Sequence, residues 1–364
     1  MASIVLDEIS HSYEPNPSGP SDYAIKRIQN TFENGGAYAL LGPSGCGKTT
    51  LLNIISGLLT PSKGLVFYDG KDVTELPPEK RNISQVFQFP VLYDTMTVYD
   101  NLAFPLRNRG VPGSKADGRV QEIAEILDLT PYLKKKAVGL SADAKQKVSL
   151  GRGLVRNDVA AILFDEPLTV IDPQLKWYLR QKIKMIHQEL KLTLVYVTHD
   201  QVEALTFAEH VAVMHEGAIV QTGTPKDLFE NPEHKFVGYF IGSPGMNFLP
   251  CAVDGNVAHV NGADITLDKD LAAAGSRARG KLEIGIRPMY LQLSSEPGNG
   301  GVSVQVQAIE DFGSYKIVTV MLAGIPIRVR LEEDMPIPSV KTRLVFPPRW
   351  IRLYADGRLV GQKE

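Results

Sequence analysis

The sequence has few cysteines, no long hydrophobic run and almost no excess of one charge. Two cysteines in 364 residues cannot form a disulfide framework, so a reducing cytosol is the expected compartment. No uninterrupted apolar segment approaches the roughly 18 residues that cross a bilayer, so a membrane role is expected to depend on a partner. The 39 basic and 41 acidic residues leave a net charge of −2, which gives no field that attracts nucleic acid or anionic lipid.

The length of the chain and a change in its periodicity predict two domains. A chain of 364 residues exceeds the size at which a single hydrophobic core stops growing. Up to about residue 240, apolar runs typical of buried strands alternate with amphipathic helical patterns. Further on, apolar and polar residues alternate, as in 302–308 and 325–331, with glycine and proline between the segments. We expect an α/β domain at 1–240, with a helical subdomain at about 90–157, followed by an all-β barrel at 241–364.

Residues 42–49 fill every fixed position of a phosphate-binding loop. A strand pattern at 37–41 precedes the loop, and a helical pattern at 50–55 follows it, which is the context the motif requires. Glycines let backbone N–H groups surround phosphate oxygens, Lys48 adds a cation, and the Thr49 hydroxyl can bind Mg²⁺. The expected nucleotide-binding residues of this segment are Gly42, Pro43, Ser44, Gly45, Cys46, Gly47, Lys48, Thr49 and Thr50. The chain is therefore predicted to bind a nucleotide.

A second apolar strand pattern, at 159–167, ends in the acidic pair Asp165 and Glu166. Asp165 is a candidate ligand of Mg²⁺, and Glu166 is a candidate base that polarises the water attacking the γ-phosphate. A buried strand that ends in two carboxylates is costly without a nearby cation, which favours this functional interpretation.

Three further residues stand at positions where a nucleotide site could use them. Gln88 ends a predicted strand at 83–88 and could bind Mg²⁺ or orient water. His199 follows a predicted strand at 192–198 and could contact the γ-phosphate. Tyr13, about thirty residues before the phosphate loop, could stack on the adenine ring, although a lone aromatic there is more often a packing residue.

Together these residues resemble the ATP-binding subunits of ABC transporters over roughly the first 240 residues. The resemblance implies that Tyr13 stacks on adenine and that residues 42–49 are the Walker A loop. It also implies a Q-loop glutamine, a Walker B aspartate, a catalytic glutamate, a D-loop aspartate and a switch histidine, which are Gln88, Asp165, Glu166, Asp172 and His199. In this family, two subunits enclose two ATP molecules with Mg²⁺, and each site is completed by a signature loop, LSGGQ, from the opposite subunit.

The signature loop departs from the family pattern. Leu140 and Ser141 are retained, but Ala142 and Asp143 replace two glycines, and Ala144 replaces the glutamine. Glycine allows close backbone approach to phosphate. A carboxylate about 4 Å from a phosphate charge adds roughly 4 kcal/mol of repulsion at an effective dielectric near 20, which Lys145 could offset in part. The loop is expected to support hydrolysis poorly on the opposite nucleotide, unless Asp143 points away to solvent. Because this chain's own nucleotide motifs are complete, we favour a heterodimer with a second, different ATPase over a homodimer with two impaired sites.

The end of the chain also resembles known ATPases. Segments 240–248 and 285–288 resemble the regulatory domain of carbohydrate-importing ABC ATPases, an oligonucleotide/oligosaccharide-type barrel expected to support dimerisation and regulation. Segments 86–90 and 140–147 resemble one of the two non-identical ATPases of bacterial glycerol importers. The implied partners are transmembrane permease subunits, a second ATP-binding subunit and, indirectly, a periplasmic solute-binding protein. The implied location is the cytoplasmic face of the bacterial inner membrane, and sn-glycerol 3-phosphate, another polyol or a sugar remain possible solutes.

Other ATPase classes fit the sequence less well. A chromosome-maintenance ATPase needs a long coiled coil between the two nucleotide motifs, where only about 110 residues lie. A tandem translation-factor ATPase needs two phosphate loops, and this chain has one. A regulatory subunit that binds ATP without hydrolysing it is the remaining alternative. The altered signature supports it, whereas Glu166 and His199 argue against it.

Overall fold

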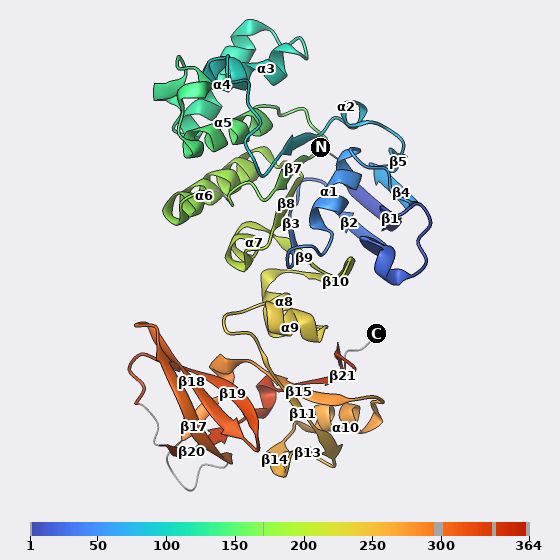
Figure 1. Ribbon diagram of the computed structural model, residues 1–364, viewed down its shortest axis with the longest axis vertical. Helices are drawn as coiled ribbons and strands as arrows, with labels where there is room; N and C mark the ends of the chain where they lie inside the picture. Colours follow the sequence, from blue (N-terminus) through green and yellow to red (C-terminus); the bar gives the residue numbers. More distant parts are fainter. Residues whose placement is uncertain (1, 170, 295–300, 337–339, 362–364) are drawn as a thin grey trace. The chain divides into compact units, whose positions relative to one another are not determined.

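The structure is a computed structural model that describes residues 2–169, 171–294, 301–336 and 340–361 (Figure 1). The chain divides into two compact units, the first ending at Pro225 and the second beginning at Lys226. The boundary expected at 240 therefore falls inside the second unit.

The first unit is built on a six-stranded sheet with the order β10-β9-β3-β8-β7-β6. Its strands are β3 (Ala37–Leu41), β6 (Ser84–Val86), β7 (Ile162–Asp165), β8 (Leu194–Thr198), β9 (His210–His215) and β10 (Ala218–Gly223). All neighbours pair in parallel except β9 and β10, which form a hairpin. The strands β3, β7 and β8 are completely buried, which explains why they appear in the sequence as continuous apolar runs. Because they are parallel, their carboxyl ends lie at the same edge of the sheet.

A smaller antiparallel sheet, in the order β2-β1-β4-β5, packs in the same core. Its strands are β1 (Ile4–His11), β2 (Ile25–Phe32), β4 (Lys63–Tyr68) and β5 (Lys71–Asp72). The helix α1 (Lys48–Ser56) contributes Leu51, Leu52, Ile54 and Ile55 to this core, together with residues from both sheets. The helix that follows the phosphate loop is thus held by packing on both sides.

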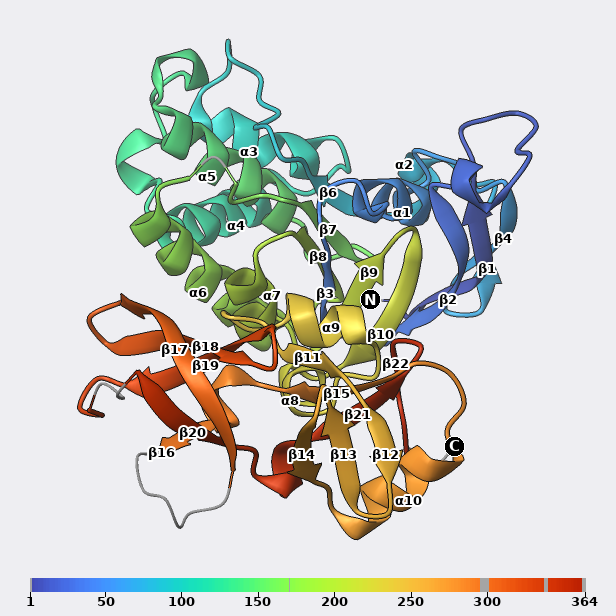
Figure 2. The same ribbon diagram turned by 60° about the horizontal axis from the view of Figure 1, so that its bottom comes forward.

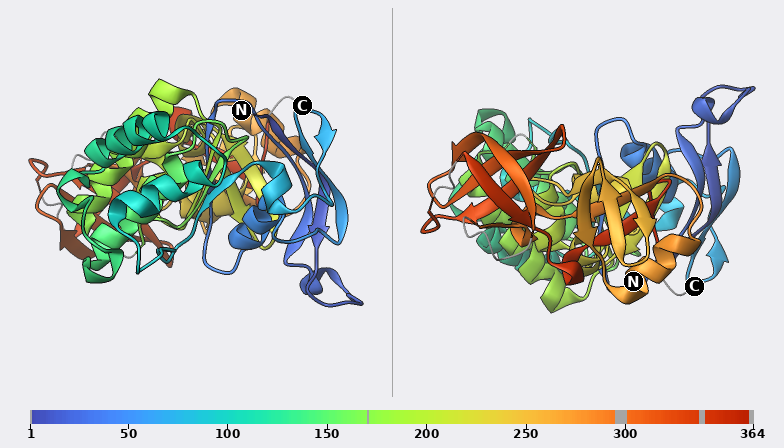
Figure 3. Two further views of the ribbon diagram at one scale, coloured as in Figure 1. Left: turned by 90° about the horizontal axis from the view of Figure 1, so that it is seen from above. Right: turned by 90° about the horizontal axis from the view of Figure 1, so that it is seen from below.

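The remaining α-helices of the first unit lie partly within the region at about 90–157, where a helical subdomain was expected. They are α2 (Pro78–Arg81), α3 (Val98–Arg107), α4 (Gly113–Ile126), α5 (Ala142–Leu154), α6 (Pro173–Leu190) and α7 (Gln201–Phe207). Helices α3, α4 and α5 pack on one another, apart from the blue antiparallel sheet (Figure 3, left). Gly151 permits this packing, because a Cβ there would lie 2.6 Å from the Leu102 side chain.

In its described residues, the second unit contains three antiparallel sheets around one core (Figure 2; Figure 3, right). The strands of its first two sheets are β11 (Asn247–Pro250), β15 (Leu282–Ile286), β21 (Arg352–Ala355), β22 (Arg358–Leu359), β12 (Ala252–Asp254), β13 (Val257–Val260) and β14 (Ala263–Thr266). The third sheet is formed by β16 (Gln292–Ser294), β17 (Val302–Asp311), β18 (Tyr315–Leu322), β19 (Ile325–Glu332) and β20 (Lys341–Val345). The predicted strands at 302–308 and 325–331 are present. Along β19 the alternate residues Ile327, Val329 and Leu331 are buried, whereas Ala308 of β17 is exposed.

The second unit is not all-β. It also contains α8 (Pro225–Glu230), α9 (Lys235–Phe240) and α10 (Lys269–Arg277). The side chain of Asp268 caps the amino end of α10 by accepting a hydrogen bond from the backbone of Lys269. Ala272 and Gly275 form its buried face, and these small residues differ from the large apolar residues by which amphipathic helices are usually recognised.

Arg287 explains why the second unit begins before residue 240. Its guanidinium is 2% exposed and donates to the backbone oxygens of Phe229 (2.6 Å), Ile241 (2.5 Å) and Leu228 (3.5 Å). It also stacks on the Phe229 ring, with 3.8 Å between the guanidinium carbon and the ring centre. Burial lowers the pKa of Arg287 to about 10. These contacts fix the segment containing α8 and α9 to β15.

Candidate functional site

The phosphate loop has a backbone conformation that its glycines permit. Gly45 and Gly47 have φ values of +80° and +100°, which residues with side chains rarely adopt. A Cβ at Gly42 would lie 2.3 Å from the backbone oxygen of Met214, and one at Gly47 would lie 2.6 Å from that of Ala24. The loop therefore packs directly against neighbouring backbone. It leads into α1, and among the described residues no side chain caps the amino end of that helix.

Lys48 lies inside the loop. Its Nζ donates to the backbone oxygens of Gly42 and Pro43, both at 2.9 Å, and the residue is 5% exposed. The neighbouring Cys46 thiol is buried, and burial raises its pKa despite the nearby ammonium group. The loop thus places the Lys48 ammonium near the uncapped amino end of α1, and both favour the binding of an anion.

Tyr13 is brought next to the loop by β1. Its hydroxyl shares a 3.1 Å hydrogen bond with Oγ1 of Thr50, and the edge of its ring contacts His11 at a centroid distance of 4.8 Å. The side chain is 65% exposed. A large aromatic ring is thus held at the helix that follows the phosphate loop, with much of its surface available for stacking.

The predicted Mg²⁺ ligands Thr49 and Asp165 meet at the carboxyl edge of the main sheet. Oγ1 of Thr49 donates to Oδ1 of Asp165 at 3.1 Å. Burial raises the pKa of Asp165, and the charge of Glu166 adds to the shift. Gln88 follows β6, which ends at Val86, two residues earlier than predicted; within the described part of the chain, β6 is an edge strand paired with β7. Gln88 is partly exposed and makes no hydrogen bond to another described residue.

Glu166 and His199 are in direct contact. Nδ1 of His199 donates to Oε2 of Glu166 at 2.9 Å, and Oγ1 of Thr169 donates to the same oxygen at 3.2 Å. Glu166 has a φ of +46°, and its backbone N–H donates to Val197 of β8. A left-handed conformation is unusual for glutamate and often marks a functional position. The strained turn directs its carboxylate toward His199.

The signature residues form the start of α5 rather than a loop before it. Ser141 is the N-cap, and its Oγ accepts from the backbone N–H of Ala144 at 3.3 Å. Ala142 and Asp143 occupy the first helical turn, and the Asp143 carboxylate has no hydrogen-bond partner among the described residues. Nζ of Lys145 lies 3.4 Å from Asp94, so it is paired with that residue and not with Asp143.

Asp172 is the N-cap of α6, where Oδ1 accepts from the backbone N–H of Gln174 at 2.9 Å. The residue is exposed. The Asp172 side chain is therefore accessible to another subunit at the start of α6.

Comparisons with known proteins agree with this geometry. Residues 25–169 match the family described as ABC transporter, and residues 242–288 match the MalK OB fold domain. A putative ATP-binding protein of Brucella abortus is 41% identical over 86% of this chain and 87% of its own length. The chain belongs to the ABC transporter ATPase family. The sn-glycerol-3-phosphate import ATP-binding protein UgpC is 39% identical in Ruegeria pomeroyi, over 89% of this chain and 88% of the relative, and 37% identical in Yersinia pestis, over 97% of both.

Solved structures of ABC ATPases resemble the chain as well. One is cbiO1 from Clostridium perfringens, part of the ABC transporter complex cbiONQ, with a TM-score of 0.56 and 26% identity. It covers 63% of this chain and 90% of its own. Another is a dimeric ATP-binding cassette in a post-hydrolysis state with ADP and Pi, with a TM-score of 0.55 and 27% identity over 61% of this chain and 98% of its own.

The residues of this ABC ATPase fit the family's cofactors, ATP and Mg²⁺. The glycine conformations and the buried Lys48 suit a polyphosphate, and the hydroxyl–carboxylate pair of Thr49 and Asp165 suits a hard cation. In the described part of the chain, no group of three or more histidine, cysteine, aspartate or glutamate side chains could hold a metal ion.

Asp165→Asn is expected to raise the melting temperature of the nucleotide-free ATPase by about 1–4 °C while removing Mg²⁺-dependent turnover. The fold raises the pKa of this carboxyl group, so its charged form is less stable in the folded than in the unfolded chain, and the isosteric amide removes that cost. The amide oxygen still accepts from Thr49. Calorimetry without nucleotide measures the shift, and the exposed Asp254→Asn serves as a control for charge alone. A lower melting temperature for Asp165→Asn would contradict the argument.

Two residues that contact the site were missed in the sequence. Gln146 of α5 is fully buried, and its Nε2 donates to the backbone oxygen of Pro167 at 2.6 Å, which ties the signature helix to the turn containing Glu166. Its spacing to the buried Leu150 and Leu154 indicates that it lies on the inner face of the helix. Thr169, three residues after Glu166, gave no comparable signal in the sequence.

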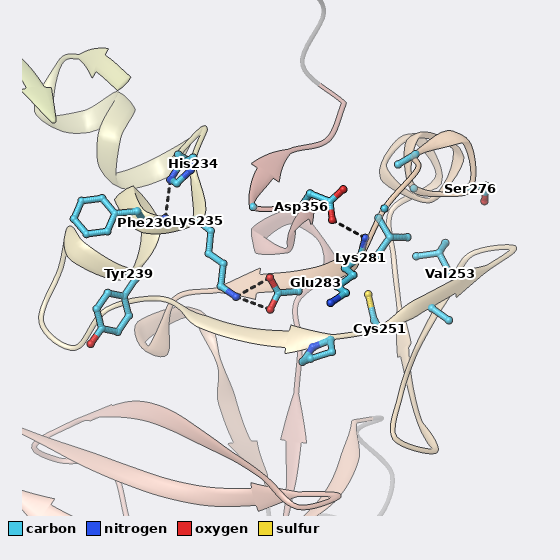
Figure 4. A pocket seen from close by; sticks show the side chains of 17 residues that line it. His234, Lys235, Phe236, Tyr239, Cys251, Val253, Ser276, Lys281, Glu283 and Asp356 are labelled. Atoms are coloured by element: carbon cyan, nitrogen blue, oxygen red, sulfur yellow. Dashed lines mark hydrogen bonds and ion pairs between the residues drawn. The ribbon is translucent and has the colours of Figure 1, made fainter. Parts of the chain in front are cut away.

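A separate open pocket of about 1070 Å³ lies within the second unit (Figure 4). Nζ of Lys235 donates to both carboxylate oxygens of Glu283, at 2.6 and 2.7 Å, and Oδ1 of Asp356 accepts from the backbone N–H of Lys281 at 3.0 Å. The predicted site residues all belong to the first unit. The carboxylates of Glu283 and Asp356 therefore already have hydrogen-bond partners within this pocket.

Proposed function

We propose that this ABC ATPase powers an importer by hydrolysing ATP at a site in which Glu166 is the base and His199 holds it. The main support for this proposal is the hydrogen bond between His199 and Glu166. Glu166 directly follows Asp165, which is bonded to Thr49. The His199 imidazole and the Thr169 hydroxyl both donate to one oxygen of Glu166, which leaves the other oxygen able to accept a proton from water. Gln88 is proposed to orient that water.

The phosphate loop and Tyr13 bind the nucleotide in this proposal. Backbone N–H groups of residues 42–50 and the Lys48 ammonium bind the phosphates, and the Tyr13 ring stacks on adenine. Thr49 and Asp165, with Gln88 beside them, would hold Mg²⁺, which neutralises charge on the phosphates when bound. Because the Thr49 hydroxyl and the Asp165 carboxylate are already in contact, little rearrangement is needed to present both oxygens.

The partner subunits are proposed to include a transmembrane permease, because similar relatives are named as import ATP-binding proteins. No helix in the described part of the chain is long and apolar enough to span a membrane. A groove of about 250 Å³ is lined by Phe87, Val91, Pro105 and Arg152, among others. The side chains of Phe87, Phe89 and Val91 are 38%, 68% and 55% exposed. Clustered exposed apolar residues are typical of interaction sites, so we propose that a helix of the permease binds here, at the cytoplasmic face of the inner membrane.

The second ATP-binding subunit is proposed to be different from this chain. All residues needed around this chain's own nucleotide are present. Its signature, however, would place the Asp143 carboxylate near the opposite nucleotide, and Lys145 does not neutralise that charge because it pairs with Asp94. Repulsion of this kind destabilises phosphate at that site, although the amino end of α5 offsets part of it. A partner with an intact signature would give one competent site, built on this chain's ATP.

The transported solute is proposed to be glycerol or a related polyol, with sn-glycerol 3-phosphate as the closest alternative. The segments 86–90 and 140–147 favour glycerol, while two of the similar relatives are named as importers of sn-glycerol 3-phosphate. A periplasmic binding protein and the permease would select the solute, so the residues of this chain do not distinguish these possibilities.

Purification of the complex from the native cell tests the assembly. We expect a permease and a second, different ATPase to copurify, and the complex in vesicles to hydrolyse ATP faster with glycerol and its binding protein. Glycerol, sn-glycerol 3-phosphate and maltose are the probes. Recovery of copies of this chain alone, with ATPase activity equal to that of the complex, would contradict the heterodimer.

A further inference from the structure

A buried carboxylate lies directly behind the segment that contains His199. Glu203 of α7 is 3% exposed, although glutamate is almost never buried unless it is paired. Its Oε2 accepts from the Thr198 hydroxyl at 2.8 Å and from the Tyr196 hydroxyl at 3.1 Å. Both donors belong to β8, the strand that ends immediately before His199. Glu203 is thus fixed to the strand that delivers the histidine.

The Thr198 hydroxyl connects Glu203 to the other side of His199. While it donates to Glu203, the same oxygen accepts from the backbone N–H of Asp200 at 3.0 Å. Asp200 in turn caps α7, because Oδ1 accepts from the backbone N–H groups of Val202 and Glu203. The residues before and after His199 are therefore held by one closed set of hydrogen bonds that includes Glu203.

Glu203 is also held from a second helix. Nζ of Lys176 lies 3.8 Å from Oε1 of Glu203, and Lys176 is one turn after the α6 cap Asp172. The two oxygens of the carboxylate thus face different elements, β8 on one side and α6 on the other. A bidentate anchor of this kind restricts rotation of the carboxylate and of the strand end bonded to it.

We propose that Glu203 is a positioning residue for ATP hydrolysis, which holds the turn 198–200 so that the His199 imidazole stays bonded to Glu166. The proposal rests on the proposed role of His199. Glu203 does not contact the nucleotide in this account, and it acts through Thr198. Loss of this anchor releases the turn, and displacement of a reacting group by about 1 Å can lower a rate by roughly 10²-fold.

Matched substitutions separate positioning from general stability. Glu203→Gln keeps an oxygen that accepts from both hydroxyls, and Glu203→Ala removes it. Thr198→Ser keeps the connecting hydroxyl, and Thr198→Val removes it with almost no change in volume. Glu189→Gln, at an exposed position of α6, controls for the loss of one negative charge. The assay measures kcat, KM for ATP, binding of an ATP analogue and melting temperature, with the full chain in its purified complex.

Glu203→Ala and Thr198→Val are expected to lower kcat by about 10–100-fold, with KM and analogue affinity within about threefold of the parent. Glu203→Gln and Thr198→Ser are expected to retain kcat within about fivefold, because the hydrogen bonds are preserved. A kcat unchanged in Glu203→Ala would overturn the proposal. So would equal losses in kcat and analogue affinity, which indicate a general distortion of the fold.

The variant His199→Ala distinguishes this inference from the function on which it rests. If His199→Ala is inactive while Glu203→Ala is fully active, the role of His199 stands and the positioning role of Glu203 is wrong. If His199→Ala turns over normally, the proposed role of the histidine itself is wrong, whatever Glu203 does.

Discussion

Glu166→Gln is expected to lower the ATP turnover of the complex by about 10²–10⁴-fold, the range that a positioned general base contributes. Glutamine has the same shape, and its oxygen can still accept from His199 and Thr169, so the turn with its positive φ is preserved. What is lost is the ability to take a proton from water. Phosphate release over a range of ATP concentrations measures the effect.

The same variant is expected to keep its affinity for ATP and to remain as a closed dimer with ATP bound, because binding does not require the base. Size-exclusion chromatography with and without ATP tests this, and Thr169→Val is a control that removes one contact of Glu166 but leaves the carboxylate. Normal turnover in Glu166→Gln would exclude Glu166 as the base. It would also indicate that another group in the complex supplies the base.

Lys48→Ala is expected to weaken ATP binding by about 10–100-fold, the value of one hydrogen bond to a charged group. The effect has two physical sources in the structure. The ammonium that would face the outer phosphates is removed, and the backbone oxygens of Gly42 and Pro43 lose the donor that holds them at 2.9 Å. Titration of the purified chain with a fluorescent ATP analogue measures the affinity.

Two controls make the result for Lys48 specific. Lys63→Ala removes the same charge from an exposed position of the first unit and is expected to bind ATP normally. Lys48→Arg keeps the charge but replaces the compact ammonium with a wider planar group, and we expect it to recover part of the affinity. Unchanged affinity in Lys48→Ala would contradict the assignment of the phosphate loop.

The sequence predicted the parts of the site that depend on local spacing. The phosphate loop needs glycine, lysine and threonine at fixed offsets between a strand and a helix, and all of them lie in one continuous segment. The parallel strands β7 and β8 were recognisable as apolar runs that end in polar residues. Since the ends of parallel strands share one edge of a sheet, the proximity of Glu166 and His199 could be anticipated.

The interactions that depend on long-range packing could not be predicted. Gln146 contacts Pro167, 21 positions later, and nothing in the local pattern of α5 indicates that partner. The early start of the second unit depends on Arg287, whose three backbone acceptors lie 46 to 59 positions earlier. Nor does the sequence show that Lys145 pairs with Asp94, because its nearest acidic neighbour along the chain is Asp143.

The bond between Gln146 and Pro167 has a thermodynamic consequence for an assembled dimer. In the proposed dimer, it would join the helix that faces the neighbouring subunit's nucleotide to the turn that contains Glu166 of the same chain. Any ligand that shifts that turn between two arrangements must also shift the helix, and linkage requires the influence to be equal in the reverse direction. The affinities of the dimer for its two nucleotides would then be coupled, so that binding of the first ATP changes the binding free energy of the second.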